Sequence, residues 1–385
     1  MTVPAQDPTT PSATVPEPRP AAGSSAGAAV TVDGRAFWTL LRDAVARAVV
    51  GAEEPLRLVA VALLADGHAL VEDVPGTGKT LLARATAAAL GLDTARVQGT
   101  PDLLPVDVTG GSLLEGGGLR FVAGPVFTNI LLVDEINRAT PRTQSALLEA
   151  MQERQVSIEG RTRPLPAPFL VLATQNPIEY EGTFALPEAQ LDRFLVRLRI
   201  GYPTDAGERA IARRHAGEAA EPLADVHAVS DGPTILALRE RVRRLRVADE
   251  VEAYLVALNA ATRVHPNLSL GGSPRASVAL YRAAQAWAFL DGRDFVRVDD
   301  VQAVAPAVLA HRLLVDVERG IRGATAESAL AEILAEVPAP PGSRPVSESA
   351  AEPQTGTGAA IATRPVSPYA RPADGGTRPT PSRSR

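Results

Sequence analysis

The chain has 385 residues, of which 45% are hydrophobic, 22% charged and 4% aromatic, so it can bury a sizeable core and exceeds the length of one ordinary domain. It contains no cysteine, which excludes disulfide frameworks, thiolate metal sites and cysteine nucleophiles. A formal net charge of -5 gives no basic footprint for nucleic acid, and no apolar run is long enough for a membrane segment, so we expect a cytoplasmic protein.

The two ends of the chain differ in composition from its middle. Residues 1–31 contain 6 prolines and residues 337–385 contain 10, and both stretches are poor in large apolar residues. Such segments bury too little surface to offset the entropy of ordering, so we expect disordered tails at 1–31 and 337–385. The C-terminal tail repeats an Arg-Pro pair, and a solvated linker is favoured over a docking segment.

The first predicted strand, 68–71, leads through a glycine-rich turn into a predicted helix at 81–90. The turn has the order of a phosphate-binding loop: Val74, Pro75, Gly76, Thr77, Gly78, Lys79 and Thr80. In such a loop, backbone N–H groups cradle phosphates, Lys79 reaches the β- and γ-phosphates, and the Thr80 hydroxyl is a ligand of Mg²⁺. The strict pattern has glycine at position 73, where this chain has aspartate, so an ordinary strand–turn–helix is the alternative.

Lysine is rare in this chain. Lys79 is the single lysine among 39 basic residues, and the other 38 are arginine. An ammonium is a compact point charge, whereas a guanidinium is a wide planar fork. A crowded loop that admits a cation between phosphate oxygens needs the former, which supports the phosphate-loop interpretation.

Two further predicted strands end in polar residues. The strand at 129–133 ends in Asp134 and Glu135, and the strand at 169–173 is followed closely by Asn176. In a parallel sheet the carboxyl ends of the strands meet at one crevice. We expect Asp134 to hold Mg²⁺, Glu135 to orient or deprotonate the attacking water, and Asn176 to help position that water. Solvated acids at a strand end and a routine Asn-Pro turn are the alternatives.

The remaining elements are two hairpins and a helical region. Glycine-containing turns predict hairpins at 112–122 and 156–163. Apolar residues at three- and four-residue spacing predict helices at 248–264, 274–290, 298–315 and 326–336. A helix from about Pro233 carries the basic cluster Arg239, Arg241, Arg243, Arg244 and Arg246. No aromatic residues interleave with this cluster, which favours a solvated face over nucleic-acid contact.

Several segments together resemble the MoxR family of AAA+ ATPases. They are 124–127, 134–139, 143–153, 173–177, 181–184 and 186–194, and the variant loop at 72–76 has that family's usual form. The resemblance extends from about 49 to 314. One departure is Gly99, where a bulky residue such as phenylalanine is expected.

The resemblance implies an α/β fold, with an AAA+ P-loop core at 32–202 followed by an all-helical lid at 203–336. It implies that ATP and Mg²⁺ are bound and that the protein works as a homo-oligomeric ring, expected to be a hexamer. By motif match, Val50 and Gly51 pack near the base, Asn176 is sensor 1, and Arg193 is an arginine finger that acts on a neighbour's nucleotide. Arg275, in the motif at 272–276, resembles sensor 2 and is expected to reach the nucleotide from the lid.

Three functions are compatible with these features. The first is ATP-driven remodelling of a partner, which the resemblance suggests is a von Willebrand factor A-domain protein. The second is a metal-insertion motor similar to the ATPase subunit of magnesium chelatase. The third is a nucleotide-controlled binding module with slow hydrolysis. In this family the two hairpins face the ring pore or the partner, and neither nucleic acid nor a membrane is an expected partner.

Overall fold

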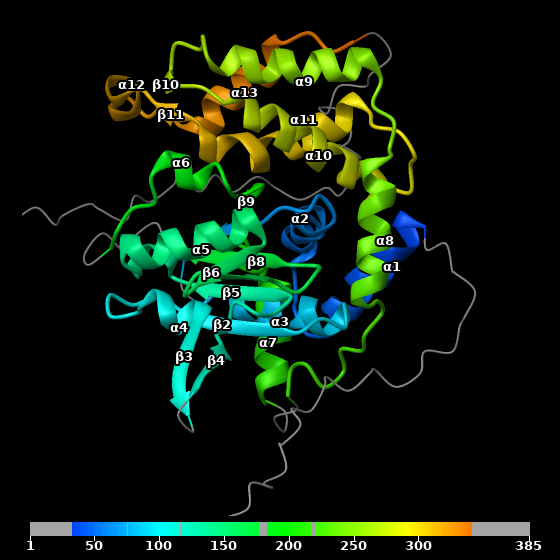
Figure 1. The fold of residues 1–385 in the computed structure, drawn as a ribbon. Helices are drawn as coiled ribbons and strands as arrows, with labels where there is room; N and C mark the ends of the chain where they lie inside the picture. Colours follow the sequence, from blue (N-terminus) through cyan, green and yellow to red (C-terminus); the bar gives the residue numbers. More distant parts are fainter. Residues whose placement is uncertain (1–32, 75, 116–117, 177–182, 217–220, 341–385) are drawn as a thin grey trace, which may run out of the picture. The chain divides into compact units, whose positions relative to one another are not determined.

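A computed structural model describes residues 33–74, 76–115, 118–176, 183–216 and 221–340 (Figure 1). The predicted tails lie outside these residues, apart from 337–340. The described residues belong to one compact unit. Within them, no helix has the length and apolar character to cross a membrane.

A five-stranded parallel sheet organises the first part of the chain (Figure 1). Its strand order is β2-β5-β8-β1-β9. The strands are β1 (Ala69–Glu72), β2 (Thr94–Gln98), β5 (Ile130–Asp134), β8 (Leu170–Gln175) and β9 (Val196–Leu198). The predicted strands 68–71, 129–133 and 169–173 are confirmed as β1, β5 and β8.

Both faces of the sheet are buried. Successive side chains of a strand point to opposite faces, so Ala69 and Val71 of β1 join one apolar core and Leu70 joins the other. The first core contains α1 (Gly34–Ala46), α2 (Glu53–Leu64) and α3 (Lys79–Ala89). The second contains α4 (Pro105–Thr109) and α5 (Pro141–Glu153). This burial explains the nearly continuous apolar runs of β5 and β8.

Both predicted hairpins are present. Strands β3 (Gly110–Glu115) and β4 (Gly118–Ala123) pair antiparallel, as do β6 (Gln155–Ile158) and β7 (Arg161–Pro164). The β3–β4 hairpin projects away from the sheet (Figure 1). It exposes Leu113, Leu114 and Leu119, whose exposed fractions are 62%, 77% and 72%.

The second part of the chain is mainly helical. After α7 (Asp205–Ala216) it contains α8 (Gly232–Arg243), α9 (Asp249–Thr262), α10 (Pro274–Leu290), α11 (Val298–Leu309), α12 (Val317–Ile321) and α13 (Ala326–Glu336). The predicted helices 274–290 and 326–336 coincide with α10 and α13. The apolar core of α1 to α3 continues into this lid, where α10 packs against α1 and α2.

The helix predicted at 298–315 is too long. α11 ends at Leu309 and is followed by the 3-10 turn η2 (Ala310–Arg312) and by β11 (Leu314–Val315). Pro306 lies inside α11 and removes one helical hydrogen bond because it has no N–H. Beyond the turn, β11 pairs with β10 (Leu268–Leu270), a two-stranded sheet that the sequence did not indicate.

The basic cluster on α8 is not a uniformly solvated face, and this expectation is wrong for Arg239. Only 5% of Arg239 is exposed. Its guanidinium donates to the Leu63 carbonyl at 2.8 Å and to the Asp66 carboxylate at 2.7 Å. Burial lowers the pKa of Arg239 to about 10. This arginine therefore joins α8 to the end of α2 instead of facing a nucleic acid.

Candidate active site

The glycine-rich turn between β1 and α3 has a conformation that requires glycine. Gly76 and Gly78 have positive φ values of 83° and 85°, which residues with a side chain rarely adopt. No atom lies within 4 Å of where a Cβ would stand at either position, so the turn is open above both. Pro75 lies outside the described residues. The loop thus offers an uncrowded backbone surface in front of the N-terminus of α3.

Asp73, the residue that departs from the strict loop pattern, fixes the start of the turn. Its carboxylate accepts backbone N–H groups from Val74 at 2.8 Å, Ile200 at 2.9 Å and Gly201 at 2.7 Å. Three such donors satisfy a carboxylate that is only 8% exposed. An aspartate here joins the loop to the segment after β9, which a glycine could not do.

Lys79 and Thr80 begin α3 and face the end of β5. The Lys79 ammonium donates to the carbonyls of Asp73 at 2.7 Å and Val74 at 3.1 Å, so it lies over the loop. The Thr80 hydroxyl donates to the Asp134 carboxylate at 3.4 Å. The structure therefore brings together the two residues that the sequence assigned to Mg²⁺.

Asp134 and Glu135 are held by different neighbours. Asp134 is 6% exposed and accepts hydrogen bonds from the Thr174 hydroxyl at 3.3 Å and from Arg96 at 2.6 Å. Glu135 has a positive φ of 54°, and its carboxylate accepts from Gln98 at 3.0 Å and from Arg138 at 3.2 Å. The positive φ turns the chain sharply after β5.

Gly99 explains how the turn after β5 is accommodated. Its N–H donates to the Asp134 carbonyl at 2.6 Å, and a Cβ at this position would stand 2.2 Å from the Glu135 carbonyl oxygen. That space has no room for a bulky side chain in this chain, which accounts for glycine at the position where the family resemblance leads one to expect a larger residue. Gly99 instead allows β2 to approach the acidic end of β5.

The sequence assigned three other residues to the nucleotide, namely Asn176, Val50 and Gly51. Asn176 is 6% exposed and follows β8, whose Gln175 lies beside Glu72 of β1. It is therefore at the same sheet edge as the loop. Val50 and Gly51 lie in the turn between α1 and α2. α1 packs against α3, the helix that begins with the loop lysine.

The donors at this edge fit Mg²⁺ with a nucleotide. Thr80 and Asp134 supply hard oxygen ligands, and Mg²⁺ usually takes one or two protein oxygens together with phosphate oxygens and waters. Within the described ranges, no group of three or more His, Asp or Glu residues could hold a metal by itself. The Arg96 side chain is 57% exposed, so it is free to leave Asp134 when a cation binds.

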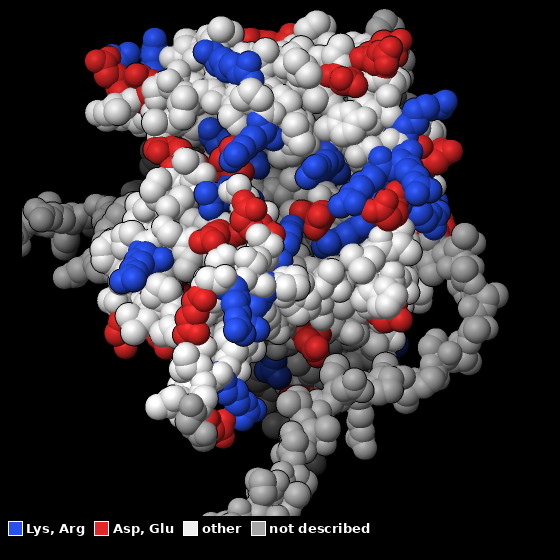
Figure 2. Space-filling model, viewed as in Figure 1, with Lys and Arg blue, Asp and Glu red and all other residues white. Residues whose placement is uncertain are grey.

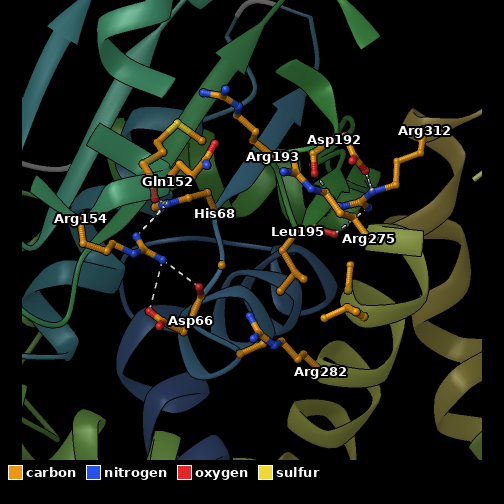
Figure 3. A pocket seen from close by; sticks show the side chains of 15 residues that line it. Asp66, His68, Gln152, Arg154, Asp192, Arg193, Leu195, Arg275, Arg282 and Arg312 are labelled. Carbon is orange, nitrogen blue, oxygen red and sulfur yellow. Dashed lines mark hydrogen bonds and ion pairs between the residues drawn. The ribbon is translucent and has the colours of Figure 1, made fainter. Parts of the chain in front are cut away.

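Arg193 and Arg275 lie together in a different cavity, of about 440 Å³ (Figure 3). Arg193 follows α6 (Glu188–Leu191), and Arg275 is in the first turn of α10. The lining contains five arginines and two aspartates, which gives a formal charge of +3. In the space-filling view, basic side chains gather across the middle of this face, between α5 and the lid helices (Figure 2).

The cavity that contains Arg193 and Arg275, called the arginine cavity below, and the phosphate loop lie at opposite ends of the strands of the sheet. Gly67, His68 and Leu195 line the cavity, and they precede the parallel strands β1 and β9. The phosphate loop follows the carboxyl end of β1. A strand rises about 3.3 Å per residue, so the four residues of β1 separate the two edges by roughly 13 Å. The structure therefore groups Arg193 with Arg275 and does not group them with Lys79.

Sequence reasoning missed three residues around these sites. Gln98 contacts Glu135, and Arg282 and Arg312 line the arginine cavity. Arg282 had a signal, because it lies seven residues after Arg275 and so on the same face of a helix. Gln98 and Arg312 had none, since their contacts depend on tertiary pairing.

Comparison with known proteins adds to this geometry. Residues 68–196 match the model of the ATPase family associated with various cellular activities (AAA), and residues 260–333 match the AAA lid domain. The chain is 47% identical over 296 residues to the uncharacterized protein YeaC of Bacillus subtilis, covering 76% of this chain and 92% of that protein. It is 44% identical over 281 residues to Chaperone MoxR1 of Mycobacterium tuberculosis, covering 70% and 74%. The crystal structure of a candidate ATPase from Cytophaga hutchinsonii superposes with a TM-score of 0.75 at 36% identity, covering 79% of this chain and 95% of that chain.

Proposed function

Because the chain belongs to the MoxR family of AAA+ ATPases, we propose that it binds ATP with Mg²⁺ and hydrolyses it to ADP and phosphate. The observation that carries this proposal is the meeting of Thr80 and Asp134 beside the loop that holds Lys79. These groups come from two separate strand ends, and an ordinary strand–turn–helix gives no reason for them to converge.

Each residue at this edge has a task in the proposed reaction. The loop N–H groups and Lys79 bind the phosphates, and Thr80 and Asp134 hold Mg²⁺, which when bound neutralises charge on the phosphate oxygens. Glu135 takes the proton of the water that attacks the γ-phosphorus, and the bond to the β,γ-bridging oxygen breaks. Asn176 helps to orient that water.

We infer that Arg193 and Arg275 act on the nucleotide of a neighbouring protomer in a ring, expected to be a hexamer. Their position at the other edge of the sheet from the loop supports this assignment, as does the positive charge of their cavity. Within the described part of the chain, neither guanidinium has a hydrogen bond or an ion pair. Each chain then offers a loop at one edge and arginines at the other, an arrangement that a head-to-tail ring satisfies.

We further propose that hydrolysis drives remodelling of a partner protein that carries a von Willebrand factor A domain. The name of the 44% identical relative, Chaperone MoxR1, supports a remodelling role. The exposed leucines of the β3–β4 hairpin provide an apolar surface for such contact. Adding a purified A-domain protein should raise the ATPase rate, and replacing Leu114 and Leu119 by serine should remove the stimulation while leaving the basal rate unchanged.

The catalytic assignment predicts different defects for two substitutions. Lys79→Ala should abolish ATP binding, because it removes the ammonium that faces the phosphates. Glu135→Gln should retain binding and lose hydrolysis by roughly 10²-fold or more, because the amide keeps the shape but takes no proton. Titration with a fluorescent ATP analogue and a phosphate-release assay measure the two steps. Equal binding by Lys79→Ala and the wild type would refute the loop assignment.

Mixed rings test the trans assignment. Arg193→Ala and Lys79→Ala should each be inactive alone. After subunit exchange, an Arg193→Ala protomer retains its own loop, and a Lys79→Ala neighbour supplies the arginine, so roughly a quarter of the interfaces become competent in an equal mixture. If exchange is demonstrated and no activity returns, Arg193 does not act in trans. Arg138 is a poorer substitute for this role, because it pairs with Glu135 of its own chain.

A further inference from the structure

Arg312 is a buried arginine that the proposed reaction does not use. It ends the turn η2 after α11, and its side chain is only 3% exposed. A buried guanidinium is destabilising unless its donors are paired. The groups that its guanidinium contacts therefore indicate the role of Arg312.

Most of its contacts are made to the segment that contains Arg193. Its Nε donates to the Asp192 carboxylate at 2.8 Å. Its Nη2 donates to the carbonyls of Phe194 at 2.7 Å and Asp192 at 3.3 Å, and its Nη1 donates to the Leu195 carbonyl at 3.2 Å. The guanidinium thus binds the backbone on both sides of Arg193.

Two other lid residues bind the same segment. The neighbouring His311 has its Nε2 3.0 Å from the Phe194 carbonyl. The hydroxyl of Ser273, which lies two residues before Arg275, donates to the Asp192 carboxylate at 3.3 Å. The lid therefore binds the Asp192 carboxylate and the carbonyl groups on both sides of Arg193, while the Leu195 N–H is bound by the His68 carbonyl, at 2.8 Å.

The side chain of Arg193 is not fixed by polar contacts with the described residues. Its side chain extends away from the Asp192–Arg312 pair (Figure 3). Its Nε is buried without a hydrogen-bond partner among the described residues. The direction of this side chain is consequently set by the backbone that carries it and not by its own polar contacts.

We propose that Arg312 is a positioning residue that orients Arg193 and makes the arginine finger depend on the place of the lid. The inference rests on the proposed trans role of Arg193. Arginine suits the task because its planar fork binds several acceptors in fixed directions, whereas a lysine ammonium binds as a point charge. A displacement of the lid then moves the finger away from the neighbouring nucleotide.

The test uses Arg312→Ala in mixed rings of the full chain. We expect ATP affinity to stay within about threefold of the wild type and kcat to fall by roughly 10²-fold, as for a 1 Å misplacement of a catalytic group. Mixing with Lys79→Ala should restore activity, because the Lys79→Ala protomer supplies an intact finger. Mixing with Arg193→Ala should restore nothing, because both protomers then lack a working finger.

A matched control separates positioning from general lid stability. Arg293 forms another buried ion pair in the lid, with Asp300, whose side chain is 3% exposed. Arg293→Ala should lower the melting temperature. In mixed rings with Arg193→Ala it should still supply a working Arg193 to its neighbour. Arg312→Lys should recover only part of the rate. If Arg312→Ala does not fold, Asp192→Asn weakens the same anchor while keeping its shape.

The outcomes are distinguishable. If Arg193→Ala is itself not rescued by Lys79→Ala, the trans assignment fails and the positioning role fails with it. If Arg193→Ala is rescued but Arg312→Ala hydrolyses ATP at the wild-type rate, only the positioning role is overturned. Loss of activity in Arg312→Ala that Lys79→Ala cannot rescue would also overturn it, because the residue would then be merely structural.

Discussion

Replacing Gly99 by alanine tests whether the close approach of β2 to the end of β5 positions the carboxylate of Glu135, the proposed general base. The added Cβ would stand 2.2 Å from the Glu135 carbonyl oxygen and 3.0 Å from the Asp134 carbonyl oxygen. Both neighbours are backbone atoms, so no side chain can rotate out of the way. The contact with Glu135 must open from 2.2 Å to at least 3.0 Å.

Such a shift should affect stability and catalysis to different extents. Overpacking of this kind costs about 1–3 kcal/mol of the free energy of unfolding. A displacement of Glu135 by a large fraction of an ångström should lower kcat by roughly 10- to 100-fold. ATP affinity should change little, because Lys79 and Thr80 are untouched. Denaturant unfolding, nucleotide titration and phosphate release measure the three quantities.

Gly320→Ala is the matched control. A Cβ at Gly320 would meet only the Val315 side chain, at 3.7 Å, which is an ordinary contact. This variant should hydrolyse ATP at the wild-type rate. Wild-type stability together with a wild-type kcat in Gly99→Ala would refute the argument, because a clash with backbone cannot be free of consequence.

Two further predictions concern Gln98, which contacts Glu135, and two buried histidines. Gln98→Ala removes a donor to the Glu135 carboxylate and should lower kcat about tenfold at unchanged ATP affinity, whereas an unchanged kcat would show that Arg138 alone orients Glu135. Burial lowers the pKa of His68 and His311 well below the ordinary 6.5, so the unfolded chain takes up protons that the folded chain does not. The free energy of unfolding should therefore fall as the pH drops below about 6.5, by up to roughly 1.4 kcal/mol per pH unit for each histidine, and a flat profile between about pH 7.5 and about pH 5.5 would contradict neutral burial.

The central strands could be predicted from the sequence and the edge strands could not. β5 and β8 are buried on both faces, so they appear as continuous apolar runs. β2 alternates polar and apolar residues at the edge of the sheet, and β9 has three residues. Whether such short segments become strands depends on the neighbour that pairs with them. The end of α11 was missed for the same reason, since β11 forms only by pairing with β10.

The candidate site also has a part that the sequence predicts and a part that it does not. The phosphate loop is contiguous, so its residues and their spacing are visible in the sequence. The contact between Gln98 and Glu135 joins residues 37 positions apart, and that between Arg312 and Asp192 joins residues 120 positions apart. Neither pair has a local pattern. Sequence also could not indicate that Arg193 and Arg275 share a cavity at the edge of the sheet away from Lys79.

The apolar core connects the phosphate loop of one chain with the arginine cavity of the same chain. α3 begins with Lys79 and packs against α1, and α1 packs against α10, which carries Arg275. Close-packed protein interiors transmit a shift of one helix to the next instead of absorbing it. In a head-to-tail ring, a movement of α3 on nucleotide binding would thus reach the lid of the same chain. Because Arg312 joins the lid to the Arg193 segment, that movement would also change the site of the next protomer if Arg193 acts in trans as proposed.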